Sequence, residues 1–84
     1  MRRTHVFKLI PMLNPDGVVN GSYRCSLAGQ DLNRCWDAPS KRRHPPIYHA
    51  KRLLERLGRG RAVTAFLDLH GHSREEDVFA YVMP

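Results

Sequence analysis

The sequence predicts an α/β fold, a fragment of a mixed, mostly parallel sheet with one crossover helix. Residues 6–12 and 62–69 are nearly continuous in apolar character, which is typical of strands covered on both faces. Between them, residues 45–58 repeat apolar side chains at helical spacing. A strand, a helix and a strand in this order form a βαβ unit, in which the strands are parallel and the connection is right-handed.

The first expected strand, residues 6–12, should finish near Pro11, because proline cannot donate a hydrogen bond to a ladder. Residues 14–17, Asn-Pro-Asp-Gly, then supply turn chemistry: proline presets φ, and glycine permits a positive φ. Asn20 and Gly21 give a second turn signal. Turn formation alone is a sufficient explanation for both sequences.

Residues 22–46 show little periodicity and predict a long connection, of a length that is often functional. The side chains of Arg24, Asn33 and Arg34 suit a carboxylate ligand, since guanidinium groups bind carboxylates bidentately and an amide adds a donor. The alternative is that Asp31 holds one of these arginines in an ordinary ion pair. Trp36 is expected to anchor the loop to the core.

The expected helix begins at Pro45 and Pro46, where a missing N–H costs nothing, and Gly58 is a natural stop. Its apolar side chains should cover the sheet, and its charged side chains should face solvent. The apolar positions are Ile47, Ala50, Leu53, Leu54 and Leu57.

The second expected strand, residues 62–69, leads directly into an acid and two histidines. A histidine where a strand leaves a sheet can offer a neutral nitrogen to a metal, which makes His70 a candidate ligand. Asp68 lies two residues earlier, so an extended chain places it on the same face, where a carboxylate can fix the tautomer of a ligand. The alternative is that His70 and His72 are loop histidines without a ligand. Residues 78–82 are expected to begin a third strand.

At 84 residues, the chain has the size of one small domain or of a piece of a larger one. Its formal net charge of +6 fits an acidic partner such as a nucleic acid, an anionic membrane or an acidic polypeptide tail, although a solvated basic face is the commoner explanation. Cys25 and Cys35 are too few for a structural zinc site and are expected to be reduced packing residues. No apolar run resembles a secretory signal or a membrane span, so we expect a cytosolic protein.

Four sequence motifs, in this order, resemble the zinc metallocarboxypeptidases, and most of all the cytosolic carboxypeptidases, which remove C-terminal glutamates from polyglutamylated proteins such as tubulin. The resemblance spans nearly the whole chain. It implies that residues 1–84 are a central segment of the catalytic domain, truncated at both ends. The four motifs are residues 7–17, Tyr23-Arg24-Cys25-Ser26-Leu27, Asp31-Leu32-Asn33-Arg34 and Asp68-Leu69-His70-Gly71-His72-Ser73.

The resemblance also implies a role for individual residues. His70 matches the last of three zinc ligands, and Arg24 matches the arginine that polarises the scissile carbonyl and stabilises the oxyanion. Asn33 and Arg34 match the pair that binds the substrate's terminal carboxylate. Asp31 matches a carboxylate that orients a zinc-binding histidine. The cofactor implied is Zn²⁺, and the partners implied are acidic C-terminal tails such as polyglutamylated tubulin, with no nucleic acid and no membrane.

The sequence also departs from the family pattern. The His-x-x-Glu motif that supplies two zinc ligands is expected upstream of residues 14–17, and the catalytic glutamate is expected beyond Pro84. His72 and Glu75 also read His-x-x-Glu, but they would need an unusual loop to reach one ion together with His70. We therefore expect a metallocarboxypeptidase segment that is inactive by itself. The alternative is a non-catalytic basic fragment that binds acidic protein tails or nucleic acid.

Overall fold

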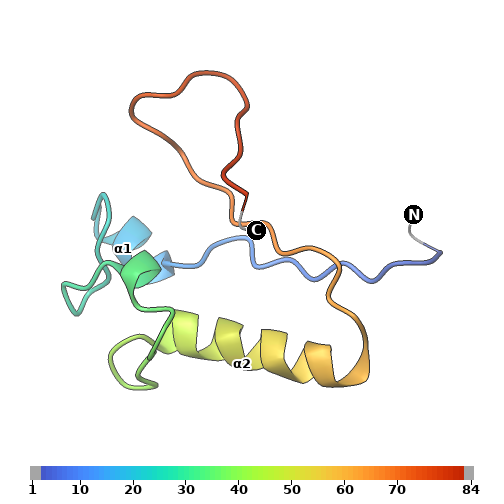
Figure 1. The fold of residues 1–84 in the computed structure, drawn as a ribbon. Helices are drawn as coiled ribbons and strands as arrows, with labels where there is room; N and C mark the ends of the chain where they lie inside the picture. Colours follow the sequence, from blue (N-terminus) through green and yellow to red (C-terminus); the bar gives the residue numbers. More distant parts are fainter. Residues whose placement is uncertain (1–2, 83–84) are drawn as a thin grey trace.

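The computed structural model describes residues 3–82. In chain order, its elements are α1 (Pro15–Val19), the short 3-10 helix η1 (Leu32–Arg34) and α2 (Pro45–Gly60). Figure 1 shows α2 as the longest element, with an extended N-terminal segment running above it and a C-terminal segment that turns back over it. Among the described residues, no helix combines the length and apolar character that crossing a membrane requires.

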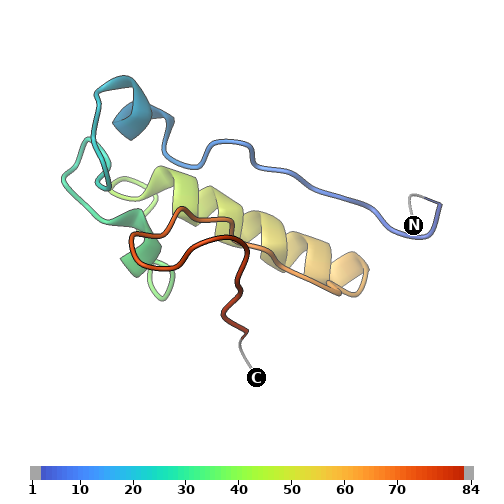
Figure 2. The same cartoon turned by 90° about the horizontal axis from the view of Figure 1, so that it is seen from above.

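The predicted sheet is wrong. Residues 3–82 contain no strand, and the β pairing described among them is an isolated antiparallel bridge between Cys25 and Asp31. Residues 6–12 and 62–69 both lie above α2 in Figure 1, but Figure 2 shows them apart from each other, and within the described chain no backbone hydrogen bond joins them. Residues 78–82 also lack a ladder. A strand is defined by its hydrogen bonds to a neighbour, so these segments are extended chain and α2 is not a crossover helix.

The apolar side chains that suggested strands are largely exposed. Leu9 is 83% exposed, Leu67 is 80% exposed and Leu69 is 90% exposed. A continuous apolar run indicates that both faces of a segment need cover, but it does not identify the segment that provides the cover. The prediction therefore failed at the step from an apolar pattern to a strand pairing.

The prediction of a helix after the long connection is confirmed. Pro45 and Pro46 occupy its first turn, and it continues to Gly60, two residues beyond the expected stop. Its N-cap residue, His44, makes no side-chain cap bond to the helix. Instead, the Nδ1 atom of His44 accepts a hydrogen bond from the backbone N–H of Ser40 at 3.0 Å. A hydrogen bond therefore closes the turn at residues 40–44 just before the helix, and no side chain caps the N-terminus of the helix.

A small core lies where α2 meets η1. The buried hydrophobic residues of the described chain are Leu32 of η1 and Ile47 and Ala50 of α2. The Nζ atom of Lys51 donates hydrogen bonds of 2.8 Å to the backbone carbonyls of Trp36 and Asp37. A lysine ammonium thus ties α2 to the loop that follows η1.

The turn predicted at residues 14–17 closes into α1. The Oδ1 atom of Asn14 accepts a hydrogen bond from the backbone N–H of Gly17 at 3.2 Å, and its Nδ2 atom donates to the carbonyl of Cys25 at 3.2 Å. A Cβ on Gly17 would lie 2.8 Å from that carbonyl oxygen, so only glycine fits here. One asparagine therefore caps α1 and joins it to the loop that carries the arginines.

We expect the isolated 84-residue chain to melt over a broad temperature range and to bind an apolar dye. Its core is small, and it exposes large apolar side chains along both extended segments. Differential scanning calorimetry and dye fluorescence on a size-fractionated sample would measure this. A sharp cooperative transition in a monomeric sample would contradict the expectation.

Candidate functional site

The carboxylate of Asp31 holds together the loop that carries the predicted carboxylate-binding residues. Its Oδ2 atom accepts a hydrogen bond from Arg24 Nε at 2.6 Å, and its Oδ1 atom accepts one from the backbone N–H of Asn33 at 3.1 Å. The second bond caps η1. Arg34 Nε lies farther away, 4.0 Å from Oδ2. One carboxylate therefore fixes both sides of the loop.

The pair formed by Asp31 and Arg24 shifts the pKa of both groups. The hydrogen bond from Arg24, with its positive charge, lowers the pKa of Asp31, and the backbone N–H of Asn33 adds to this effect. Partial burial of the carboxylate opposes the shift. The hydrogen bond to Asp31 likewise raises the pKa of Arg24. Both groups are therefore charged at neutral pH.

The two cysteines support the same loop. Cys35 donates its S–H to the backbone carbonyl of Asp31 at 3.3 Å, and Cys25 accepts the Asn14 hydrogen bond through its carbonyl. Both are half-buried free thiols, in agreement with the sequence prediction. Cys25 forms one end of the isolated bridge, and Cys35 bonds to the residue at its other end, Asp31, so both cysteines have a structural role.

Residues far apart in the sequence meet at Asn33 and His70. The Nδ2 atom of Asn33 lies 3.4 Å from the Nε2 atom of His70. The other end of the same amide is occupied, because the Nε1 atom of Trp36 donates to Asn33 Oδ1 at 3.0 Å. The Trp36 ring also packs edge-on against Phe66, with 5.8 Å between ring centroids. Trp36 therefore orients the asparagine amide and joins its loop to the segment that leads to His70.

His70 is also paired with Asp68. Its Nε2 atom lies 2.9 Å from Asp68 Oδ2. A carboxylate only accepts hydrogen bonds, so in this pair Nε2 carries the proton and Nδ1 keeps the lone pair that a metal ion requires. The pair thus has the arrangement that carboxylates give to metal-binding histidines.

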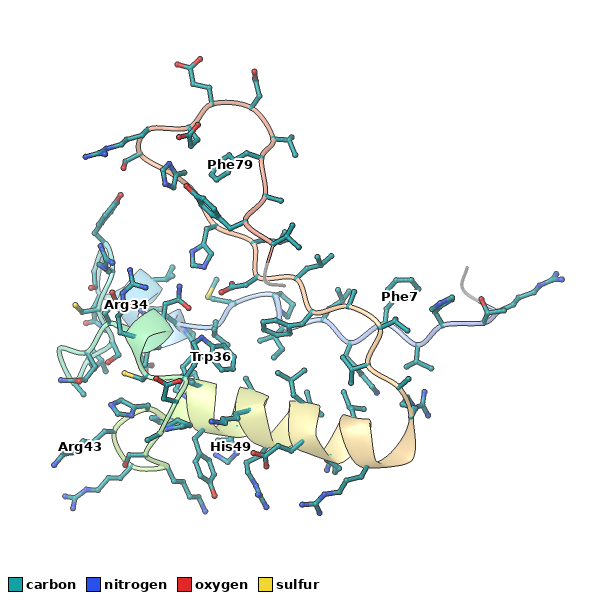
Figure 3. All side chains as sticks on the ribbon, in the orientation of Figure 1. Phe7, Arg34, Trp36, Arg43, His49 and Phe79 are labelled. Atoms are coloured by element: carbon teal, nitrogen blue, oxygen red, sulfur yellow. The ribbon has the colours of Figure 1, made fainter. Side chains whose placement is uncertain are left out.

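The structure brings some of the predicted site residues together and separates others. Arg24, Asn33 and Arg34 surround Asp31, and the side chain of Asn33 also lies next to His70. Among the described residues Asp31 contacts Arg24 and no histidine, and Asp68 lies beside His70, as their spacing in the sequence suggested. Figure 3 shows Arg34 and Trp36 on neighbouring parts of the loop around η1.

The second His-x-x-Glu sequence forms no metal site. The Nδ1 atom of His72 accepts hydrogen bonds from the backbone N–H groups of Arg74 at 3.2 Å and Glu75 at 3.0 Å. Its ring packs edge-on against Phe79, with 5.1 Å between centroids. Within the described part of the chain, no three potential ligands from His, Cys, Asp and Glu converge. His70 is therefore a single candidate ligand.

Sequence reasoning missed the amide-orienting contact of Trp36, for which it expected only a packing role. The available signal was its spacing, since Asn33 and Trp36 are three residues apart and one short helical turn brings them together. It also missed the aromatic contacts of His72, whose partners Phe79 and Tyr81 were read as strand residues.

Comparison with known sequences settles the family. Over 82 residues, or 96% of this chain, the sequence is 56% identical to cytosolic carboxypeptidase 1 of Danio rerio. It is 55% identical over the same length to cytosolic carboxypeptidase 1 of Homo sapiens, and 56% identical to human cytosolic carboxypeptidase 4. The chain belongs to the cytosolic carboxypeptidase family. No family model matches the chain, and no solved structure matches it.

This cytosolic carboxypeptidase segment spans about 7% of the length of those curated relatives. Those relatives are named carboxypeptidases. Asn33, which is distant in sequence, lies next to His70, which pairs with Asp68, and the three side chains form a polar cluster.

The first prediction from this geometry concerns Asp31. Its pKa should lie below the ordinary aspartate value, and Arg24→Gln should move it back up, because the main cause of the shift is lost. Carboxyl-carbon NMR titration of the isotope-labelled chain would measure both values. The pair is only seven residues apart in sequence, so the measurement depends on local order alone.

The lowered pKa of Asp31 also gives the sign of the pH dependence. The pair stabilises the loop fully above the ordinary aspartate pKa, and this contribution disappears as the pH falls through the lowered value. The Asn33 amide resonance should report the loss. Equal Asp31 pKa values in the wild type and in Arg24→Gln would contradict the assigned pair.

Proposed function

We propose that this chain carries the carboxylate-binding part of a zinc carboxypeptidase active site, which hydrolyses C-terminal residues, glutamates in particular, from polypeptides. The observation that supports this most directly is the contact between Asn33 and His70, which places a candidate carboxylate-binding residue beside a candidate metal ligand. An exopeptidase needs this proximity, since the terminal carboxylate lies close to the scissile bond of the last residue.

Asn33 and Arg34 bind the terminal carboxylate in this proposal. Arg34 suits the task because its side chain is 71% exposed and its contact with Asp31 is long, at 4.0 Å. Its planar guanidinium can therefore present two parallel N–H donors to a ligand. The Nδ2 atom of Asn33 adds a third donor on the side of His70.

Arg24 polarises the scissile carbonyl and stabilises the oxyanion. Asp31 engages its Nε–H, which leaves the terminal guanidinium N–H groups for the substrate. The same bond fixes the direction of the side chain before substrate arrives, so less reorganisation is needed in the reaction. Asp31 is therefore a positioning residue for Arg24, and Asp68 has that function for His70.

His70 is the residue that would hold zinc, through its Nδ1 atom. The Nε2 pairing with Asp68 fits a metal-binding histidine, but the described residues supply one ligand and not a complete site. When bound, zinc would supply Lewis-acid polarisation of the carbonyl and an activated water. The chain's own residues bind the carboxylate and orient the carbonyl.

The substrates proposed are acidic C-terminal tails, such as those of polyglutamylated tubulin, in the cytoplasm. The net charge of +6 favours acidic polypeptides, and the relatives are named cytosolic carboxypeptidases. The second candidate function is a non-catalytic fragment that binds acidic tails. The incomplete ligand set of the described residues favours it.

Arg34→Lys tests the carboxylate assignment in a catalytic domain that carries this segment. Lysine keeps the charge but loses the planar two-donor fork, and a lost charge-assisted contact is worth about 1.5–3 kcal/mol, or about ten- to a hundredfold in kcat/KM. The substrates are a matched pair, one with a free C-terminal carboxylate and one amidated. The wild type should prefer the free acid, and Arg34→Lys should reduce that preference.

A variant with the same substitution at an arginine outside the loop, Arg61→Lys, serves as the control and should leave the preference unchanged. If Arg34 only forms an ion pair with Asp31, lysine should replace it with little kinetic effect. An unchanged preference for the free acid in Arg34→Lys would refute the assignment, even if overall activity decreased.

The isolated 84-residue chain should hydrolyse no peptide, because its described residues assemble one metal ligand where catalysis needs several. Release of glutamate from a short polyglutamate substrate, measured with and without added zinc, would test this. Zinc-dependent release that a chelator blocks would contradict it.

A further inference from the structure

The outer face of α2 carries a basic groove that the proposed site does not use. The groove is shallow, with a volume of about 340 Å³. Its lining contains three arginines and a histidine against a single acid. The lining residues are His49, Arg52, Leu53, Glu55, Arg56 and Arg59.

The arginines of the groove face away from the rest of the molecule, whereas His49 and Leu53 also line a hollow beside residues 10–15. Ile47 and Ala50 mark the side of α2 that is buried. With 3.6 residues per turn, Arg52, Arg56 and Arg59 lie on the opposite side of the helix. Figure 3 shows nitrogen-tipped side chains projecting from this side, away from the two extended segments.

The chain itself neutralises only part of the positive charge of the groove. Arg52 pairs with Glu55 at 3.0 Å, and both side chains are largely open to solvent, 60% and 42% exposed. Among residues 3–82, the structure gives neither Arg56 nor Arg59 a carboxylate within ion-pair distance. The groove therefore keeps a net positive charge that a partner can neutralise.

From these observations we infer that the α2 groove binds an acidic polypeptide segment in an extended conformation. Along the helix axis, Arg56 lies about 6 Å from Arg52 and about 4.5 Å from Arg59. Alternate side chains of an extended peptide project to one face at intervals of about 6.6 Å. Carboxylates at every second position of such a peptide can thus reach successive arginines.

The groove suits a peptide better than a nucleic acid. Its lining contains no Phe, Tyr or Trp on which a base could stack. Its short length also matches two or three peptide side chains, whereas a duplex presents a charge every 1.7 Å or so over a much longer contact. The inference does not rest on the proposed peptidase activity, because Arg24, Asn33 and Arg34 lie outside the groove.

The test measures binding of a fluorescent peptide of eight glutamates, acetylated and C-terminally amidated, to the 84-residue chain fused to a neutral carrier. The amidated end keeps the proposed carboxylate-binding residues out of the measurement. The variants are R52Q/R56Q/R59Q in the groove and K41Q/R42Q/R43Q in the exposed loop before α2, which remove the same charge. R52K/R56K/R59K keeps the charge.

The groove Gln variant should lose about tenfold in affinity, as expected for three exposed ion pairs lost together. The affinity for the peptide should fall by less than about threefold in the loop variant and in the Lys variant, because single exposed ion pairs contribute little. Equal losses in the groove and loop variants, or no loss in the groove variant, would overturn the inference. So would tighter binding of a DNA duplex of equal charge that is lost in the groove variant.

A second measurement, on the unmodified fusion, locates the peptide without a substitution. It keeps the inference testable if the groove variant loses helix content. A spin-labelled octaglutamate added to the unmodified fusion should broaden the backbone amide resonances of α2 around Arg52, Arg56 and Arg59. Residues 24–34 should remain sharp. Broadening confined to residues 24–34 would overturn the inference and assign the peptide to the proposed active-site loop.

Discussion

The carboxylate of Asp31 accepts hydrogen bonds from both directions along the chain, from Arg24 before it and from the backbone of Asn33 after it. Because these bonds close the loop and start η1, they determine where the side chains of residues 33 and 34 project. Leu32 fills the small core against α2 from the same turn. The placement of the proposed site therefore depends on one ion pair and one helix contact, and not on a sheet.

The sequence predicted local structure well where local chemistry determines it. The two prolines that open α2 and the asparagine that caps α1 act on neighbouring residues, so their signals could be read directly. The sheet prediction was wrong because strand pairing is a contact between distant segments, and residues 6–12 and 62–69 carry only apolar character. Apolar character alone cannot distinguish a paired strand from extended chain that lacks a ladder.

The residues of the candidate site could be identified from the sequence, but the contacts between them could not. Motif resemblance suggested Arg24, Asn33, Arg34 and His70, and the structure brings Asn33 to His70. The sequence left two partners for Asp31 open, an arginine and a zinc-binding histidine, and among the described residues Asp31 pairs with Arg24.

The central claim is that the loop anchored by Asp31 brings Asn33 to His70. Nuclear Overhauser effects between the side-chain amide of Asn33 and the ring of His70, in an isotope-labelled catalytic domain that carries this segment, test it most directly. The account predicts a cross-peak in the wild type that disappears in Asp31→Ala, in which the loop loses its anchor. Absence of the cross-peak from the wild type, or its persistence in Asp31→Ala, would contradict the account.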